Sequence, residues 1–140
     1  MQENPFAKNK NYCTFYIVRH GETQLNIQGL VQGHSIDSPL TDEGIKQVKS
    51  VARELSKINF DKVYSSDLLR AVRSAEIIAL EHKLAIHTSK LLRERKYGKY
   101  EGKPSELLKK FNKLFDLMTE EERVRHRVDK DAESDEELVT

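Results

Sequence analysis

The stretch that decides the fold reads Phe15-Tyr16-Ile17-Val18-Arg19-His20-Gly21-Glu22-Thr23. Its aromatic and β-branched opening predicts a buried strand, beginning near Tyr12 and ending where the polar residues start. Arg19 and His20 are therefore expected at the carboxyl end of that strand, where open α/β sheets bind their ligands. A guanidinium beside an imidazole, followed by a glycine that lets the backbone approach an anion, suits the binding and attack of a phosphoryl group.

Strands and amphipathic helices alternate after this stretch. The predicted elements are, in chain order, a helix that Thr41 caps, a strand at 62–65, a helix that Ser66 and Asp67 cap, a strand at 85–88, a helix opened by Pro104 and Ser105, and a short helix opened by Thr119 and Glu122 in capping-box spacing. This order predicts right-handed crossovers between parallel strands. The fold class is therefore α/β, a mainly parallel sheet flanked by helices.

Length and composition favour one domain. The chain has 140 residues, 37% of them hydrophobic and 34% charged, which is enough for a modest core. We divide it into a polar N-terminal lead at 1–11, a domain at 12–128 and an acidic end at 129–140. The acidic end is too rich in Asp and Glu to be packed, so we expect it to be solvated and flexible.

Charge and cysteine content exclude several partners. A net charge of +1, from 24 basic and 23 acidic side chains, gives no field that would attract nucleic acid or an anionic membrane. No segment has the apolar length of a signal peptide or a membrane span, so we expect a cytoplasmic protein. Cys13, the single cysteine, allows neither an internal disulfide nor a multi-cysteine zinc site.

Two segments near the amino terminus suit phosphate chemistry, and the first contains His20. A neutral imidazole can attack phosphorus through one nitrogen if the other donates its proton to a backbone carbonyl. Asn26 follows six positions later and offers an amide. The second segment, 32–44, runs from a Gln-Gly pair into a helix N-terminus whose free N–H groups favour an anion, although by itself it is only a capped helix.

The two later segments add a cation and an acid. Arg70 belongs to a Ser-Ser-Asp-Leu-Leu-Arg-Ala stretch that leaves a strand for a helix, which places it beside Arg19 if the two strands are neighbours. Glu94 lies in a basic, glycine-punctuated loop at 92–102 and is a candidate general acid. The alternative for this loop is a surface segment with a salt bridge. Neighbouring cations lower a carboxyl pKa whereas burial or a bound phosphate raises it, so the sequence does not fix the pKa of Glu94.

The four segments, taken in this order, resemble the histidine phosphatase superfamily, also called the phosphoglycerate mutase-like family, over roughly residues 12–104. The matching motifs are RHGET, then QG with SPLT and G, then SSDLLRA, and finally LRERKYG followed by EG. The resemblance implies a three-layer α/β/α fold without metal or cofactor. It also implies these roles: His20 becomes phosphorylated, Arg19, Asn26 and Arg70 hold the phosphoryl oxygens, Glu94 protonates the leaving oxygen, Gly21 orients His20, and Glu22 and Thr23 support the site.

Two departures from the family pattern limit the inference. Members often carry an arginine just before the Gln32-Gly33 pair, where this chain has valine. The family's second active-site histidine, in a Ser-His-Gly segment on a later strand, has no match, and the Glu133-Ser134 neighbourhood resembles the segment that precedes it. We therefore expect an incomplete domain, a rate lower by about 10²–10³-fold, and association into a homo-oligomer through the exposed sheet.

The expected function is that of a metal-independent phosphatase acting through a phosphohistidine on small phosphorylated metabolites, such as sugar or acid phosphates. Two alternatives stay open. A phosphoglycerate mutase would move phosphate between hydroxyls without net release, although the short loop around Gly98 does not favour it. A truncated, inactive phosphate-binding module would bind phosphate or vanadate saturably with no turnover.

Overall fold

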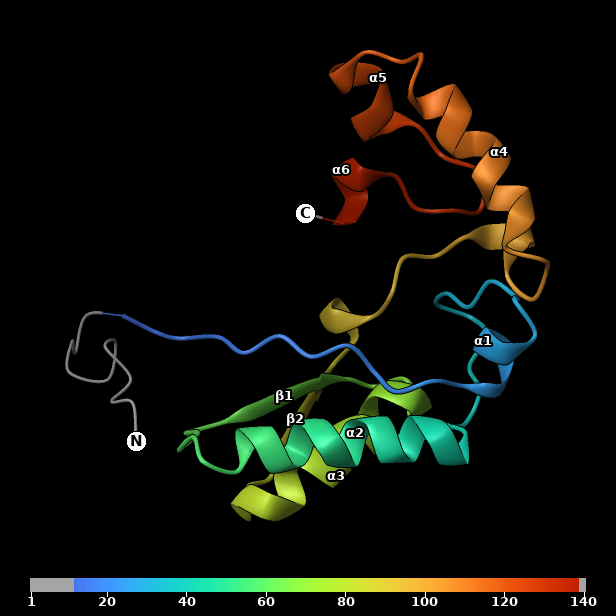
Figure 1. Ribbon diagram of the computed structural model, residues 1–140. Helices are drawn as coiled ribbons and strands as arrows, with labels where there is room; N and C mark the ends of the chain where they lie inside the picture. Colours follow the sequence, from blue (N-terminus) through green and yellow to red (C-terminus); the bar gives the residue numbers. More distant parts are fainter. Residues whose placement is uncertain (1–11, 139–140) are drawn as a thin grey trace.

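The structure, a computed structural model, describes residues 12–138, apart from the side chains of 111–113 (Figure 1). The lead predicted at 1–11 and the last two residues lie outside this range. The helices and strands are α1 (Gln24–Ile27), α2 (Asp42–Leu55), β1 (Val63–Ser66), α3 (Leu69–His82), β2 (Ile86–Ser89), the 3₁₀ helices η1 (Lys90–Leu92) and η2 (Gly98–Tyr100), α4 (Glu106–Phe115), α5 (Glu120–Arg125) and α6 (Asp135–Leu138). No helix in the described range is both long and apolar enough to cross a membrane.

Strands β1 and β2 form a parallel pair, joined by the crossover helix α3. Their register pairs Val63 with Ile86 and Ser66 with Ser89. Parallel neighbours need such a crossover, because a tight turn reverses the chain direction. The α/β fold class with a parallel sheet flanked by helices is therefore confirmed.

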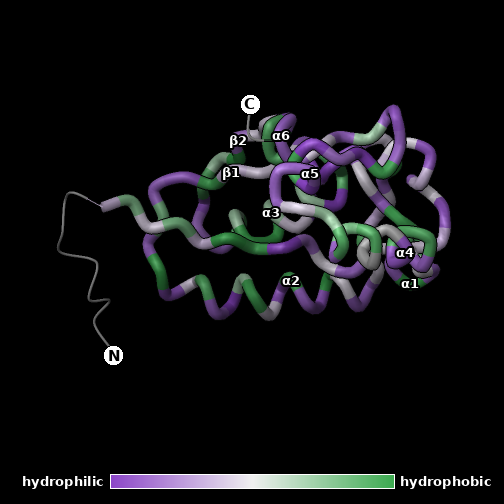
Figure 2. The backbone as a smooth tube through the Cα atoms, turned by 90° about the horizontal axis from the view of Figure 1, so that it is seen from above, coloured by the Kyte–Doolittle hydropathy of each residue, from purple (hydrophilic) through white to green (hydrophobic). Residues whose placement is uncertain are grey.

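The core lies between α2 and α3. Leu40, Val48, Ala52 and Ile78 form its buried cluster. Hydrophobic and hydrophilic residues alternate along α2 in Figure 2, as the three-and-four spacing of its apolar residues predicted. The hydroxyl of Thr41 accepts a hydrogen bond from the N–H of Gly44, so the predicted start of this helix is confirmed.

The predicted strand at the start of the domain is wrong. Residues 12–20 run alongside the rest of the fold as an extended segment (Figure 1), and no backbone hydrogen bond found among the described residues involves them. Phe15 is 78% exposed and Ile17 95% exposed. The composition suits a strand, but a strand forms only when a neighbour accepts and donates its backbone hydrogen bonds, and β1 pairs with β2 alone in the described part of the chain.

The start of α3 also differs from the prediction. Ser66 and Asp67 do not cap the helix. Instead, a carboxylate oxygen of Asp37 accepts the backbone N–H of Leu69 from 32 positions away. Its other oxygen accepts the N–H of Ser38 at 3.0 Å. The helix is thus capped by a distant loop, which the local sequence does not reveal.

The acidic end contacts the body of the protein. Ala132 and Ser134 are each only 3% exposed, and Ala132 forms a bridge with Tyr97. The carboxylate of Glu133 accepts the N–H of Lys96 at 2.7 Å, and Asp129 pairs with Lys99 at 3.1 Å. These contacts hold parts of 129–134 against the 95–99 loop, whereas Lys130, Asp131 and residues 136–138 are exposed.

Candidate active site

The imidazole of His20 is half-buried and held by its own backbone. Its Nδ1 lies 2.7 Å from the carbonyl oxygen of Gly21, which fixes the proton on Nδ1 and leaves Nε2 as the nucleophilic nitrogen. Burial lowers the pKa of His20 below its ordinary 6.5, and the charges of Arg70 and Arg19 lower it further, while Glu94 and the hydrogen bond to Gly21 oppose the shift. The site therefore favours the neutral imidazole that a nucleophile requires.

Two glycines bring the His20 turn onto α2. A Cβ at Gly21 would lie 2.4 Å from the carbonyl oxygen of Gly44, and a Cβ at Gly44 would lie 2.1 Å from the carbonyl oxygen of Glu22. The N–H of Gly21 donates to the hydroxyl of Ser74 on α3 at 3.2 Å. The turn is thus wedged between the two helices, so close packing as well as approach to an anion requires glycine at these positions.

Thr41, the N-cap residue of α2, is bound by Glu22. The Thr41 hydroxyl donates to Oε1 of Glu22 at 2.8 Å, and the Thr41 N–H donates to the Glu22 carbonyl at 2.9 Å. The N–H of Glu22 donates in turn to the side chain of Gln47 at 3.0 Å. The contacts at this helix N-terminus are those of a capped helix, because the Gly44 N–H donates to the Thr41 hydroxyl and that hydroxyl donates to Glu22.

Arg70 is buried inside a loop rather than projecting freely. Its side chain is 2% exposed and donates to the carbonyl of Gly33 at 3.0 Å, to the carbonyl of Ile36 at 3.4 Å and to Asp37 at 2.9 Å. A guanidinium has five N–H donors. Three are used in these bonds, and the positive charge of Arg70 also acts on the His20 imidazole.

Glu101 holds the same loop from the other side. Its carboxylate is 9% exposed and accepts four backbone N–H groups, from His34 at 3.3 Å, Ser35 at 2.7 Å, Ile36 at 3.1 Å and Tyr97 at 2.9 Å. We call residues 33–37, with Glu101 on one side and Arg70 on the other, the loop frame. Sequence reasoning assigned Glu101 no role, although its Glu-Gly pair stood among the matched motifs.

Asn26 is held by a capping box at α1. Its Oδ1 accepts the N–H of Thr23 at 3.1 Å and the hydroxyl of Thr23 at 3.0 Å, and its own N–H donates back to that hydroxyl. Gln32 donates to the same hydroxyl at 2.6 Å. Thr23 is fully buried, so the carbonyl side of the Asn26 amide is tied inward and its NH₂ side faces away from Thr23.

The loop that carries Glu94 is anchored by its neighbours. Arg93 forms a bidentate pair with Asp67, with distances of 2.5 and 2.6 Å, which lowers the pKa of the Asp67 carboxyl. Glu94 itself is exposed, and its Oε1 accepts the N–H of Arg95 at 2.9 Å. The loop therefore lies at the surface and carries a salt bridge at Arg93, and Glu94, the candidate acid, is exposed on it.

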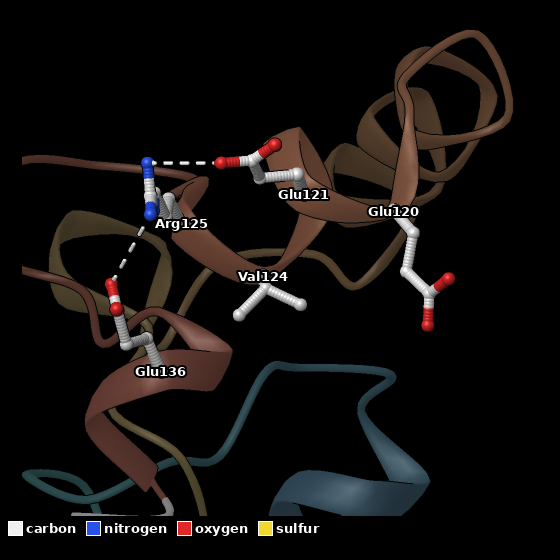
Figure 3. A pocket seen from close by; sticks show the side chains of 5 residues that line it. All are labelled: Glu120, Glu121, Val124, Arg125 and Glu136. Atoms are coloured by element: carbon white, nitrogen blue, oxygen red, sulfur yellow. Dashed lines mark ion pairs between the residues drawn. The ribbon is translucent and has the colours of Figure 1, made fainter.

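Three of the predicted residues, Arg19, Arg70 and Glu94, act electrostatically on the fourth, the His20 imidazole. Asn26 is tied to Thr23 on α1. The hollow drawn in Figure 3 lies elsewhere, between α5 and α6, with Arg125 3.4 Å from Glu121 and 3.9 Å from Glu136. None of the residues that line it is among those predicted for the candidate site.

Relatives of known name match most of the chain. Fructose-2,6-bisphosphatase TIGAR of Xenopus tropicalis is 47% identical over 97 residues, which cover 66% of this chain and 35% of that protein. Phosphoglycerate mutase-like protein 4 of Arabidopsis thaliana is 43% identical over 105 residues, covering 73% of this chain and 45% of that protein. The chain thus spans less than half the length of these relatives.

Solved structures show the same fold. The alpha-ribazole phosphatase of Shigella flexneri matches with a TM-score of 0.69 at 29% identity, over 86% of this chain and 59% of that chain. A phosphoserine phosphatase from Entamoeba histolytica matches with a TM-score of 0.57 at 40% identity, over 64% of this chain and 44% of that chain. The model of the histidine phosphatase superfamily (branch 1) matches residues 15–139. The chain belongs to branch 1 of the histidine phosphatase superfamily.

Proposed function

We propose that the protein is a phosphatase that forms a phosphohistidine at His20 on small phosphorylated metabolites, without a metal ion. The observation that carries the proposal is the 2.7 Å contact between Nδ1 of His20 and the Gly21 carbonyl, which directs Nε2 toward an attacking role beside Arg19 and Arg70. Relatives named as phosphatases of a sugar bisphosphate, of phosphoserine and of alpha-ribazole phosphate support this substrate class.

The reaction would take two steps. In the first, the lone pair of Nε2 forms the N–P bond as the bond to the substrate oxygen breaks, and Glu94 donates a proton to that oxygen. In the second, water attacks phosphorus, the N–P bond breaks, and a proton from the water returns to Glu94. Arg19, Arg70 and the NH₂ of Asn26 would offset the charge on the phosphoryl oxygens.

Hydrolysis of an aryl phosphate tests the proposal. We would compare the 140-residue chain with His20→Ala and with His87→Ala, a control on the exposed face of β2, all in the presence of a chelator. Activity in the chain and in His87→Ala, with loss in His20→Ala, is expected. Equal activity in His20→Ala would contradict the nucleophilic role.

A binding module is the second candidate, and the exposure of residues 12–18 favours it. The side chains that lead into His20 are largely exposed; Tyr16 packs edge to face against Phe60, and the Gly21 N–H donates to Ser74. Saturable vanadate binding without turnover would support this alternative. Transfer of phosphate between the hydroxyls of a phosphoglycerate, without release, would instead support a mutase.

The same exposed segment leads us to infer a homo-oligomer in solution. Phe15 and Ile17 offer exposed apolar side chains to a second copy, together with backbone groups that form no backbone hydrogen bond within the described part of the chain. Sedimentation velocity showing a concentration-independent monomer would contradict this inference. We further infer that the protein binds no nucleic acid, which rests on its near-neutral charge. We also infer a cytoplasmic location, which fractionation of cells would test.

A further inference from the structure

We propose that Gln32 is a positioning residue that fixes the orientation of the Asn26 amide through the hydroxyl of Thr23. The proposal rests on the phosphate-binding role proposed for Asn26. Gln32 touches neither the substrate nor His20 in this scheme. Its effect is to decide which face of the Asn26 amide is presented to an anion.

The argument begins with the hydrogen-bonding capacity of one buried hydroxyl. A threonine hydroxyl has one hydrogen to donate and two lone pairs to accept with. The side-chain NH₂ of Gln32 donates to Thr23 Oγ1 at 2.6 Å, and the backbone N–H of Asn26 donates to it at 3.3 Å. Both lone pairs are then used. The single hydrogen is left for the third neighbour, the Asn26 side chain at 3.0 Å.

This hydrogen can be accepted only by the oxygen of the Asn26 amide. The Thr23 backbone N–H, at 3.1 Å from the same atom, imposes the same choice. With Oδ1 facing two donors, the NH₂ group must face the opposite way, where a phosphoryl oxygen would accept from it. Reversal of the amide would place the Asn26 NH₂ opposite the Thr23 N–H and hydroxyl hydrogen, so that donors face donors. Because Thr23 is fully buried, water could not compensate for these lost hydrogen bonds.

The orientation of Gln32 is fixed in turn. The Ser38 hydroxyl donates to Oε1 of Gln32 at 3.4 Å, so the NH₂ of Gln32 points to Thr23. Ser38 is itself buried and next to Asp37, which belongs to the loop frame. A directed relay therefore runs from the loop frame through Gln32 and Thr23 to Asn26.

Replacement of Gln32 by glutamate reverses the relay. The new carboxylate only accepts, so the Thr23 hydrogen turns toward it and Asn26 loses one of the two donors that hold its oxygen. Gln32→Met removes the donor without offering an acceptor, so the Thr23 hydrogen stays on Asn26. Gln28→Glu is the matched control, because it makes the same charge change on the exposed end of α1.

Orthovanadate binding to the 140-residue chain is the first readout. We expect affinity in the order wild type and Gln28→Glu, then Gln32→Met, then Gln32→Glu, with Gln32→Glu about tenfold weaker, as the loss of one net hydrogen bond gives. Equal losses in Gln32→Met and Gln32→Glu would show a packing effect and overturn the proposal. Circular dichroism of each variant establishes that it is folded.

The orientation of the Asn26 amide is the second readout, and it does not depend on the proposed function. In the wild type, the Asn26 NH₂ protons should give only a weak nuclear Overhauser effect to the Thr23 amide proton, because Oδ1 lies between them. In Gln32→Glu this effect should grow stronger, because part of the population has reversed. An unchanged Asn26 amide in a folded Gln32→Glu would refute the relay, whereas failure of the wild type to bind vanadate would count against the proposed function alone.

Discussion

Replacement of Glu101 by glutamine should destabilise the protein far more than its small change in shape suggests. The carboxylate accepts four backbone N–H groups with two oxygens. An amide has one oxygen, so whichever way it turns, two of these N–H groups face an NH₂ that cannot accept. A buried donor left unsatisfied costs about 1–3 kcal/mol. The two together give a loss of about 3 kcal/mol in the free energy of unfolding.

This loss is large enough to measure by thermal unfolding. At roughly 2–4 °C per kcal/mol for a domain of this size, we expect the midpoint of Glu101→Gln to fall by about 10 °C. Glu106→Gln is the control, because Glu106 is exposed and pairs with Lys109 within one helical turn. Surface pairs of this kind contribute at most about 1 kcal/mol. A midpoint for Glu101→Gln within 1 °C of that control would refute the loop frame as a source of stability.

Three further outcomes follow from contacts near the site. Gly44→Ala should lower the free energy of unfolding by about 1–3 kcal/mol in denaturant titrations, because its Cβ would overlap the Glu22 carbonyl. The pKa of His20, measured by NMR, should lie below 6.5. The unfolded chain then binds more protons than the folded one, so the free energy of unfolding should rise with pH up to about 6.5. His20→Gln should abolish that part of the pH dependence. Arg93→Gln should raise the pKa of Asp67 toward its ordinary 3.8, and an unchanged NMR titration would contradict the bidentate pair.

Local patterns predicted the elements that depend on local contacts. The Thr41 cap of α2 and the Thr119 capping box of α5 join residues three positions apart, so the sequence alone determines them. The apolar spacing of α2 and the short strands β1 and β2 follow from periodicity in the same way. Within the site, the motif around His20 indicated the imidazole, its backbone partner and the neighbouring cations.

The features that sequence missed depend on partners far along the chain. Asp37 caps α3 across 32 positions, and Glu101 reaches the N–H groups of His34 to Ile36 across 65–67 positions. No window of a few residues contains both members of such a pair. The predicted strand at residues 12–18 failed for a related reason, since its side chains suit a sheet but its hydrogen bonds depend on a strand elsewhere.

The loop frame has a consequence for how substrate preference can change. Glu101 binds the loop through N–H groups, and Arg70 binds it through the Gly33 and Ile36 carbonyls, so these contacts do not depend on the exposed side chain of Ser35. His34 differs, because its imidazole pairs with Glu133 at 3.7 Å. Mutation at Ser35 is therefore free to alter size, charge and polarity on the loop while the backbone stays in place. In the proposed phosphatase, substrate preference can change there without rebuilding the chemistry at His20.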